Sequence, residues 1–123
     1  MRVIEEGASL PLSKAIEVGG LVFVSGRVPT RDGKIAGDGI AEQTEVVIDR
    51  IEEALEPFGL TLAHVVKSTV WITQAEFFGE FNQVYARRFT APYPTRSTVV
   101  SALALPGALV EIEVIASKDE TRG

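Results

Sequence analysis

Only two segments of this chain carry the apolar spacing of an amphipathic helix, and they stand among six segments with the character of strands. Apolar residues recur at helical spacing from Ile40 to Phe58 and again from Phe77 to Phe89. The strand-like segments are residues 2–5, 15–18, 21–25, 65–71, about 96–103 and 109–116. The order β-β-β-α-β-α-β-β predicts an α+β fold, with a single sheet of about six strands and both helices on one face.

Turn and capping residues in the sequence predict where these elements begin and end. Gly19-Gly20 predicts a two-residue hairpin, and the segment 30–34 predicts a second turn. For the first helix we expect Asp38 as the N-cap and Gly59 as the terminating residue, with Pro57 tightening the last turn. The sequence 73–76 (Thr-Gln-Ala-Glu) predicts a capping box at the start of the second helix.

The second helix should bury an aromatic stripe. Its members recur at helical spacing, and they are Phe77, Phe78, Phe81, Val84, Tyr85 and Phe89. The strand before it is apolar on both sides, with Val66, Val70 and Ile72 on one face and Val65 and Trp71 on the other. Two helices can cover only one face of such a sheet. We therefore expect a homo-oligomer to cover the other face, because a monomer seldom exposes so large an apolar patch.

Composition limits the classes of function. The chain has 123 residues and a net charge of −5, which favours one domain over residues 1–123 and argues against a nucleic-acid partner. Cysteine is absent, so disulfides and thiolate metal sites are impossible. The first residues lack the apolar core of a signal peptide, and no apolar run is long enough to span a membrane. We expect a cytoplasmic protein without a membrane partner.

One arginine and one glutamate suggest a site for a small acid. Arg96 stands in an extended segment behind Pro94, and Glu111 stands in the last apolar strand. A guanidinium is well shaped to bind a carboxylate through two parallel hydrogen bonds. A nearby glutamate can manage a proton or a water molecule. The pair therefore predicts a pocket for a small organic acid.

Several pieces of the sequence together resemble the Rid family of imine deaminases, the RidA/YjgF-like proteins formerly described as endoribonuclease L-PSP. They follow the family's order and spacing across nearly the whole chain. The pieces are residues 24–29 (VSGRVP), 43–44 (QT), 64–70 (HVVKSTV), 81–85 (FNQVY), 94–97 (PTRS) and 111–116 (EIEVIA).

The resemblance implies a chorismate-mutase-like two-layer fold and a homotrimer with active sites in the clefts between subunits. It implies hydrolysis of 2-imino acids and their enamine tautomers to 2-keto acids and ammonia, with no cofactor and no metal. Arg96 takes the role of binding the substrate carboxylate, and Glu111 that of handling water and a proton. Gly26 matches a glycine whose backbone approaches the ligand, and Ser25 precedes it.

Four further positions concern the pocket. Asn82 matches an asparagine near the family's pocket, and Thr98 stands where a cysteine commonly lies beside the substrate. Arg27 stands where many members carry glutamine, and Leu12 where the best-known subgroup has a pocket tyrosine. A second cation at Arg27 would either admit a longer or dicarboxylic substrate or pair with Glu111.

Other functions remain open at this point. The chain could bind keto acids as a regulatory protein without turnover, or it could deaminate a larger substrate such as 2-aminomuconate. Endoribonuclease activity fits poorly, because the chain is acidic and lacks a basic stripe for RNA. For His64, the only histidine, we expect no catalytic role, because no second histidine or cysteine accompanies it.

Overall fold

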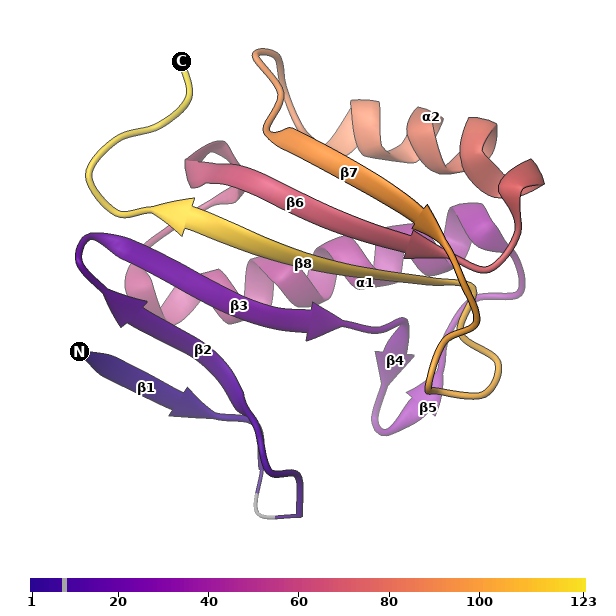
Figure 1. Cartoon of the computed structure of the whole chain (residues 1–123), viewed down its shortest axis with the longest axis horizontal. Helices are drawn as coiled ribbons and strands as arrows, with labels where there is room; N and C mark the ends of the chain where they lie inside the picture. Colours follow the sequence, from indigo (N-terminus) through magenta and orange to yellow (C-terminus); the bar gives the residue numbers. More distant parts are fainter. Residues whose placement is uncertain (8) are drawn as a thin grey trace.

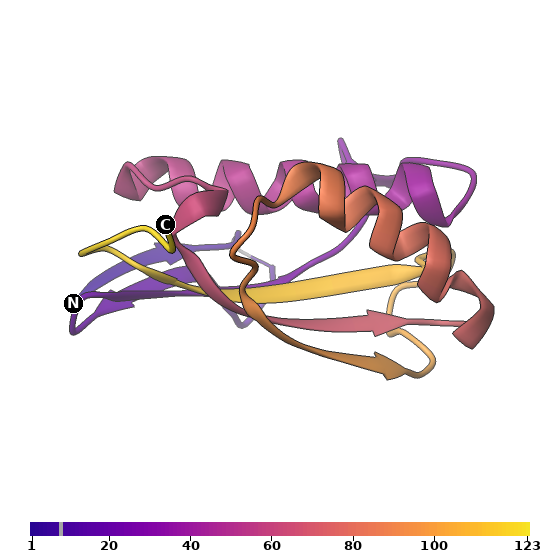
Figure 2. The ribbon, with the colours of Figure 1, turned by 90° about the horizontal axis from the view of Figure 1, so that it is seen from above.

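The chain folds into two layers, a six-stranded sheet and two helices that cover one of its faces (Figures 1 and 2). The computed structural model describes residues 1–7 and 9–123. The sheet contains β1 (Arg2–Glu5), β2 (Ser13–Val18), β3 (Leu21–Arg27), β6 (Val65–Ile72), β7 (Thr95–Val100) and β8 (Val110–Ser117). The helices are α1 (Ile40–Leu55) and α2 (Phe78–Arg88). This arrangement confirms the predicted α+β fold.

The strands lie in the order β1-β2-β3-β8-β6-β7. Only β6 and β7 are parallel, because α2 carries the chain across the sheet between them; every other neighbouring pair is antiparallel. The last strand, β8, is inserted between β3 and β6 near the middle of the sheet (Figure 1). Residues from both halves of the chain therefore meet along β8.

The two predicted turns are present. Gly19 and Gly20 have positive φ angles of 59° and 79°, and they join β2 to β3. The second turn joins β4 (Thr30–Arg31) to β5 (Lys34–Ile35), which form a separate two-stranded sheet. Its central residues, Asp32 and Gly33, also have positive φ angles, as two-residue hairpins require.

The first helix ends as predicted but begins differently. A short 3-10 turn containing Pro57 follows α1, and Gly59 closes it with a φ of 72°. The predicted N-cap, Asp38, is wrong: the N-cap is Gly39, and no side chain caps the helix. Instead the backbone N–H of Asp38 donates to the Glu42 carboxylate at 3.3 Å, which places an acidic group near the helix N-terminus.

The capping box predicted before α2 is also wrong. A 3-10 turn (Ala75–Phe77) precedes the helix, and no side chain caps either element. Among the described residues, the buried Thr73 hydroxyl has no hydrogen-bond partner. Phe78 is 44% exposed and therefore leaves the predicted aromatic stripe, whereas Phe81 and Tyr85 are buried in the core.

Strand β6 contains a bulge that changes the predicted division of its faces. Val65 pairs with Ala116 and Lys67 with Ile115, so two steps on β6 oppose one step on β8. The bulge places Val65 in the core together with Val70 and Ile72 and leaves Val66 exposed. The sequence prediction had placed Val66, and not Val65, on the same face as Val70 and Ile72, because strict alternation does not include the extra residue.

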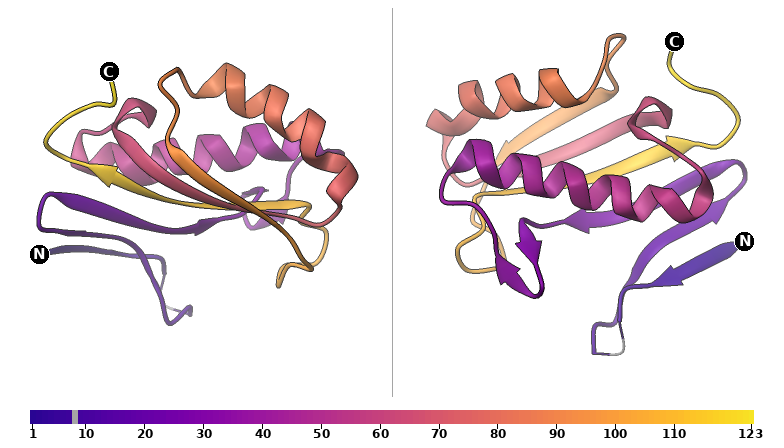
Figure 3. Two further views of the ribbon diagram at one scale, coloured as in Figure 1. Left: turned by 45° about the horizontal axis from the view of Figure 1, so that its top comes forward. Right: turned by 180° about the vertical axis from the view of Figure 1, so that it is seen from behind.

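Neither helix covers the opposite face of the sheet (Figure 3). This open face exposes apolar side chains. Pairing of Val3 with Ile16, Ile16 with Phe23, and Phe23 with Ile115 forms one continuous row across four strands. Phe23 is 42% exposed in this row.

In the described part of the chain, no helix combines the length and apolarity that a membrane crossing needs.

Candidate functional site

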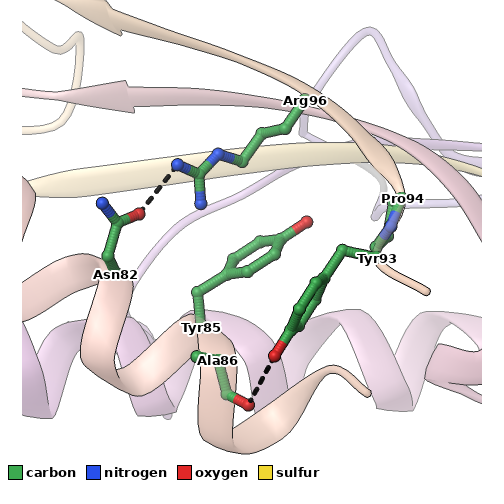
Figure 4. A pocket seen from close by; sticks show the side chains of 6 residues that line it. All are labelled: Asn82, Tyr85, Ala86, Tyr93, Pro94 and Arg96. Atoms are coloured by element: carbon green, nitrogen blue, oxygen red, sulfur yellow. Dashed lines mark hydrogen bonds between the residues drawn. The ribbon is translucent and has the colours of Figure 1, made fainter. Parts of the chain in front are cut away.

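Arg96 extends from β7 toward α2, and its guanidinium lies beside Asn82 and Tyr85 (Figure 4). Its Nη2 donates to Oδ1 of Asn82 at 2.7 Å. The guanidinium carbon lies 4.8 Å from the ring centre of Tyr85, 5.3 Å from that of Phe81 and 5.7 Å from that of Phe78. Hydrogen bonding and cation–π contacts thus orient the charge without neutralising it.

A cavity of about 360 Å³ opens beside this guanidinium. With Arg96, it is lined by Asn82, Tyr85, Ala86, Tyr93 and Pro94. Within the described residues, no carboxylate forms an ion pair with Arg96. The cavity therefore offers an unneutralised, oriented guanidinium to an anion of small size.

A buried hydrogen bond to Ser68 fixes the side chain of Tyr85. Its hydroxyl lies 2.7 Å from the hydroxyl of Ser68, and both residues are buried. Burial raises the pKa of Tyr85, so its hydroxyl stays neutral at physiological pH. The ring consequently presents a fixed, uncharged face to Arg96.

Glu111 lies against a glycine on the neighbouring strand. Val24 pairs with Val114 and Arg27 with Ile112, so β3 carries an extra residue between these pairs. The bulge brings Gly26 so close to Glu111 that an added Cβ would lie 2.1 Å from Oε2 of the carboxylate. With any other residue at position 26, this carboxylate would have to leave the position it occupies.

The surroundings of Glu111 favour its protonated form. Burial raises the pKa of the carboxyl, and the neighbouring charge of Glu113 raises it further, whereas Arg27 lowers it. Glu113 occupies the same face of β8, because residues two apart on a strand share a face, but it is exposed. Glu111 is thus the carboxyl of this strand whose raised pKa suits it to exchange protons.

Glu111 opens onto a second cavity, of about 530 Å³. Its lining includes three other predicted site residues, Ser25, Gly26 and Arg27. Leu12, the other position noted in the sequence, lines it as well. Other apolar side chains that line this cavity are Leu10, Val28, Ala104 and Leu105.

Arg27 is 4% exposed and forms an ion pair with Glu6. Its Nε also donates to the carbonyl of Ser25 at 3.0 Å. The hydrogen bond from Arg27 lowers the pKa of Glu6, which therefore stays ionised at neutral pH. The sequence left open a pairing of Arg27 with Glu111, but the structure pairs it with Glu6.

The two cavities share no lining residue, and their key side chains lie on opposite faces of the sheet. Arg96 is in register with Ser68, whose side chain is buried on the helical face. Glu111 is in register with Trp71, on the open face. A single chain therefore does not bring Arg96 and Glu111 together.

Three other residues complete the comparison with the sequence. Thr98 is in register with Val70, so it shares the helical face with Arg96 but lines neither cavity. The Ser25 hydroxyl donates to the carbonyl of Ser13 at 2.6 Å and so helps hold β3 to β2. His64 accepts a hydrogen bond from the backbone N–H of Thr61 at 3.0 Å and caps a short turn.

The described residues contain no cluster of three or more acidic or histidine side chains suited to a metal.

Sequence reasoning missed Tyr93 and Glu6. Tyr93 lies in the irregular connection before β7, where no periodicity indicates which way a side chain points. Glu6 lies 21 positions from its partner Arg27, and no local pattern links the two. Tyr85 was placed in the core stripe, which is correct, but it also forms a wall of the Arg96 cavity.

Comparisons with known proteins identify the family and the fold. The family model described as Endoribonuclease L-PSP matches residues 5–118. Reactive Intermediate Deaminase A of Arabidopsis thaliana is 40% identical over 111 residues, which cover 87% of this chain and 58% of the plant protein. The crystal structure of RidA from an Antarctic Psychrobacter species is similar with a TM-score of 0.88 and 30% identity, over 95% of this chain and 99% of that one. Escherichia coli TdcF, solved with bound serine, gives a TM-score of 0.84 and 30% identity over 95% and 98%.

Proposed function

Because the chain belongs to the endoribonuclease L-PSP family, which includes the RidA/YjgF proteins, we propose that it is a deaminase of reactive 2-imino acids. The substrates are short compounds such as 2-iminobutanoate and 2-iminopropanoate, together with their enamine tautomers. The products are the 2-keto acid and ammonia. A similar plant protein carries the name reactive intermediate deaminase, and that name supports the reaction class.

One observation carries this proposal: the guanidinium of Arg96, held by Asn82 and three aromatic rings beside an open cavity. A carboxylate can accept two parallel hydrogen bonds from such a fork. The contacts already restrict the side chain before the ligand arrives, so little rotational freedom is lost on binding. Binding through the carboxylate places the adjacent C2 imine carbon at a defined distance from Arg96.

Glu111 supplies the proton transfers of the proposed mechanism. The oxygen of a water molecule adds to C2, and the imine nitrogen takes up a proton, which gives a carbinolamine. The carbinolamine expels ammonia, and its C2 hydroxyl loses a proton to become the keto group. Glu111 accepts a proton from water and donates one to nitrogen, a role that suits a carboxyl with a raised pKa.

Arg96 and Glu111 act on one substrate only if two copies of the chain meet. We assign the active site to a cleft between subunits, where the Arg96 cavity of one copy faces the Glu111 cavity of the next. The apolar open face, with Phe23 in its central row, supports self-association. By resemblance to the family, the assembly is a homotrimer.

The ion pair between Arg27 and Glu6 bears on substrate size. Glu6 neutralises Arg27, and Arg50, the other arginine that lines the cavity beside Gly26, pairs with Glu53 at 3.3 Å, so both cations already have carboxylate partners. The leucine-rich lining of this cavity suits a short apolar side chain instead. Monocarboxylic imino acids are therefore favoured over larger dicarboxylic compounds.

A trapping assay tests the proposal. Threonine dehydratase releases 2-iminobutanoate, which semicarbazide captures as a measurable semicarbazone. The wild-type protein should suppress semicarbazone formation, and Arg96→Ala should abolish this effect. Arg87→Ala is the matched control, because Arg87 is exposed and its ion pair with Glu45 is long, at 3.6 Å. Binding of 2-oxobutanoate without suppression would identify a keto-acid-binding protein and contradict the deaminase.

A further inference from the structure

Arg122 lies in the segment that follows β8, and its half-buried guanidinium donates hydrogen bonds to backbone carbonyl groups. The guanidinium donates four hydrogen bonds of 2.6–2.9 Å, and the backbone N–H of the same residue donates a fifth of 3.0 Å. The four guanidinium acceptors are the carbonyls of Leu62, Val65, Thr90 and Pro92, and the fifth acceptor is that of Ala63.

All of these acceptors are neutral. Within the described residues, no carboxylate forms an ion pair with Arg122. Burial of the guanidinium lowers the pKa of Arg122. An arginine that uses its planar fork of donors on several carbonyls at once holds backbone segments in a fixed relative position.

The carbonyls come from two separate parts of the chain. Leu62 lies in the 3-10 turn before β6, and Val65 is the first residue of that strand. Both precede the pairing of β6 with β7, which begins with Lys67 and Thr95. Thr90 and Pro92 lie in the connection between α2 and β7, residues 89–94. Arg122 therefore joins this connection to the sheet where strand pairing has not yet begun.

The connection leads directly into the Arg96 cavity. Tyr93 and Pro94 form part of the cavity wall, and Arg96 follows two residues later. The Tyr93 hydroxyl makes only a long hydrogen bond, 3.5 Å, to the carbonyl of Ala86. Arg122 donates two shorter hydrogen bonds to the same connection, to the carbonyl of Pro92 at 2.6 Å and to that of Thr90 at 2.9 Å.

We infer that Arg122 is a positioning residue, which orders residues 89–94 and thereby shapes the cavity in which Arg96 binds the substrate carboxylate. This inference rests on the proposed function for the identity of the ligand. The ordering of the connection does not depend on it. Loss of the guanidinium should raise the Kd for the acid and the KM, whereas kcat should change little, because no reacting atom contacts Arg122.

Hydrogen exchange measured by mass spectrometry tests the ordering directly. In Arg122→Ala and in Arg122→Gln, the hydrogen-bonded amides at the two ends of the connection, that of Phe89 and those of the first residues of β7, should exchange about tenfold faster or more than in wild type. Amides of β6 and β8 should keep their protection, which shows that the variants remain folded. Lys118→Ala is the control in the same segment, because Lys118 pairs with Glu17 and not with the connection. It should exchange like wild type.

Binding of 2-oxobutanoate, measured by calorimetry on the same proteins, tests the consequence for the cavity. Both Arg122 variants should bind about tenfold more weakly, with a similar rise in KM and a change in kcat of about twofold at most. Unchanged exchange at Phe89 and at the first residues of β7, or faster exchange with unchanged affinity, would overturn the inference. If the wild-type protein itself does not bind 2-oxobutanoate, the proposed function fails, and the exchange data alone decide whether Arg122 orders the connection.

Discussion

Gly26 and Glu111 act as a pair, because the carboxylate occupies the space that any side chain at position 26 would need. In Gly26→Ala the new Cβ would lie 2.1 Å from Oε2, so the carboxylate has to move. We expect a loss of at most about 1 kcal/mol of folding stability, because the end of a flexible side chain can turn aside, and at least a tenfold loss of activity. Denaturant unfolding and the trapping assay measure the two effects.

The double variant distinguishes this clash from a general effect at position 26. Adding Gly26→Ala to Glu111→Ala should cost little stability, because the clashing carboxylate is gone. Gly79→Ala is a control for the glycine substitution itself, since no atom lies within 4 Å of its added Cβ. Equal destabilisation by Gly26→Ala in both backgrounds would contradict the account.

Glu111 also predicts a dependence of stability on pH. Its pKa is raised in the folded protein, chiefly by burial, so folding favours the protonated carboxyl. This contribution is fully present below the unfolded pKa of about 4.3 and is lost as pH rises through the folded pKa. Glu111→Gln should therefore be more stable than wild type at pH 7, with the difference vanishing near pH 3. Urea unfolding across that range measures it, and a variant less stable at pH 7 than at pH 3, relative to wild type, would contradict it.

Among the elements, α1 and the loop before β8 are joined by one buried amide. Gln43 donates to the carbonyls of Gly37 and Gly107 at 3.2 and 3.1 Å, and its Oε1 accepts from the N–H of Leu109 at 2.7 Å. Gln43→Met should lose about 1–3 kcal/mol, because buried backbone groups lose their partners. Denaturant unfolding measures this loss. The exposed Gln83→Met should be nearly neutral, and equal effects of the two substitutions would refute the role of Gln43.

The sequence predicted the elements well because each depends on local periodicity and turn chemistry. The order of strands and helices, the Gly19-Gly20 hairpin and the Gly59 helix end follow from neighbouring residues alone. The wrong predictions, at Asp38 and at Val65 and Val66, concern places where tertiary contacts select between local alternatives. Strand alternation could not reveal the bulges, because each inserts one residue without changing the apolar character of the strand.

The candidate site was predicted less completely, for a physical reason. Arg96, Asn82 and Glu111 could be named from motifs, but their neighbours come from segments distant in sequence. The ion pair of Glu6 with Arg27 and the carbonyl contacts of Arg122 form only when the sheet brings those segments together. Pairing across 21 or more positions leaves no periodic trace in the sequence.

For the whole molecule, the open apolar face predicts self-association. Phe23 lies in the central row of that face, away from the core residues Val22 and Val24. Phe23→Glu should separate the assembly into monomers of 13.3 kDa without unfolding them, since a charge cannot be buried there unpaired. Sedimentation equilibrium should give three times that mass for wild type. A variant that keeps the wild-type mass would exclude this face from the interface.

A mixing experiment tests most directly whether Arg96 of one copy and Glu111 of another serve the same substrate. Arg96→Ala and Glu111→Ala, each inactive alone, are unfolded together in equal amounts and refolded. If the residues come from different subunits, random assembly restores about a quarter of the sites, and imine hydrolysis should return to about a quarter of the wild-type rate. If both residues of a site came from one chain, every site would lack one of them, and the mixture would stay as inactive as its components.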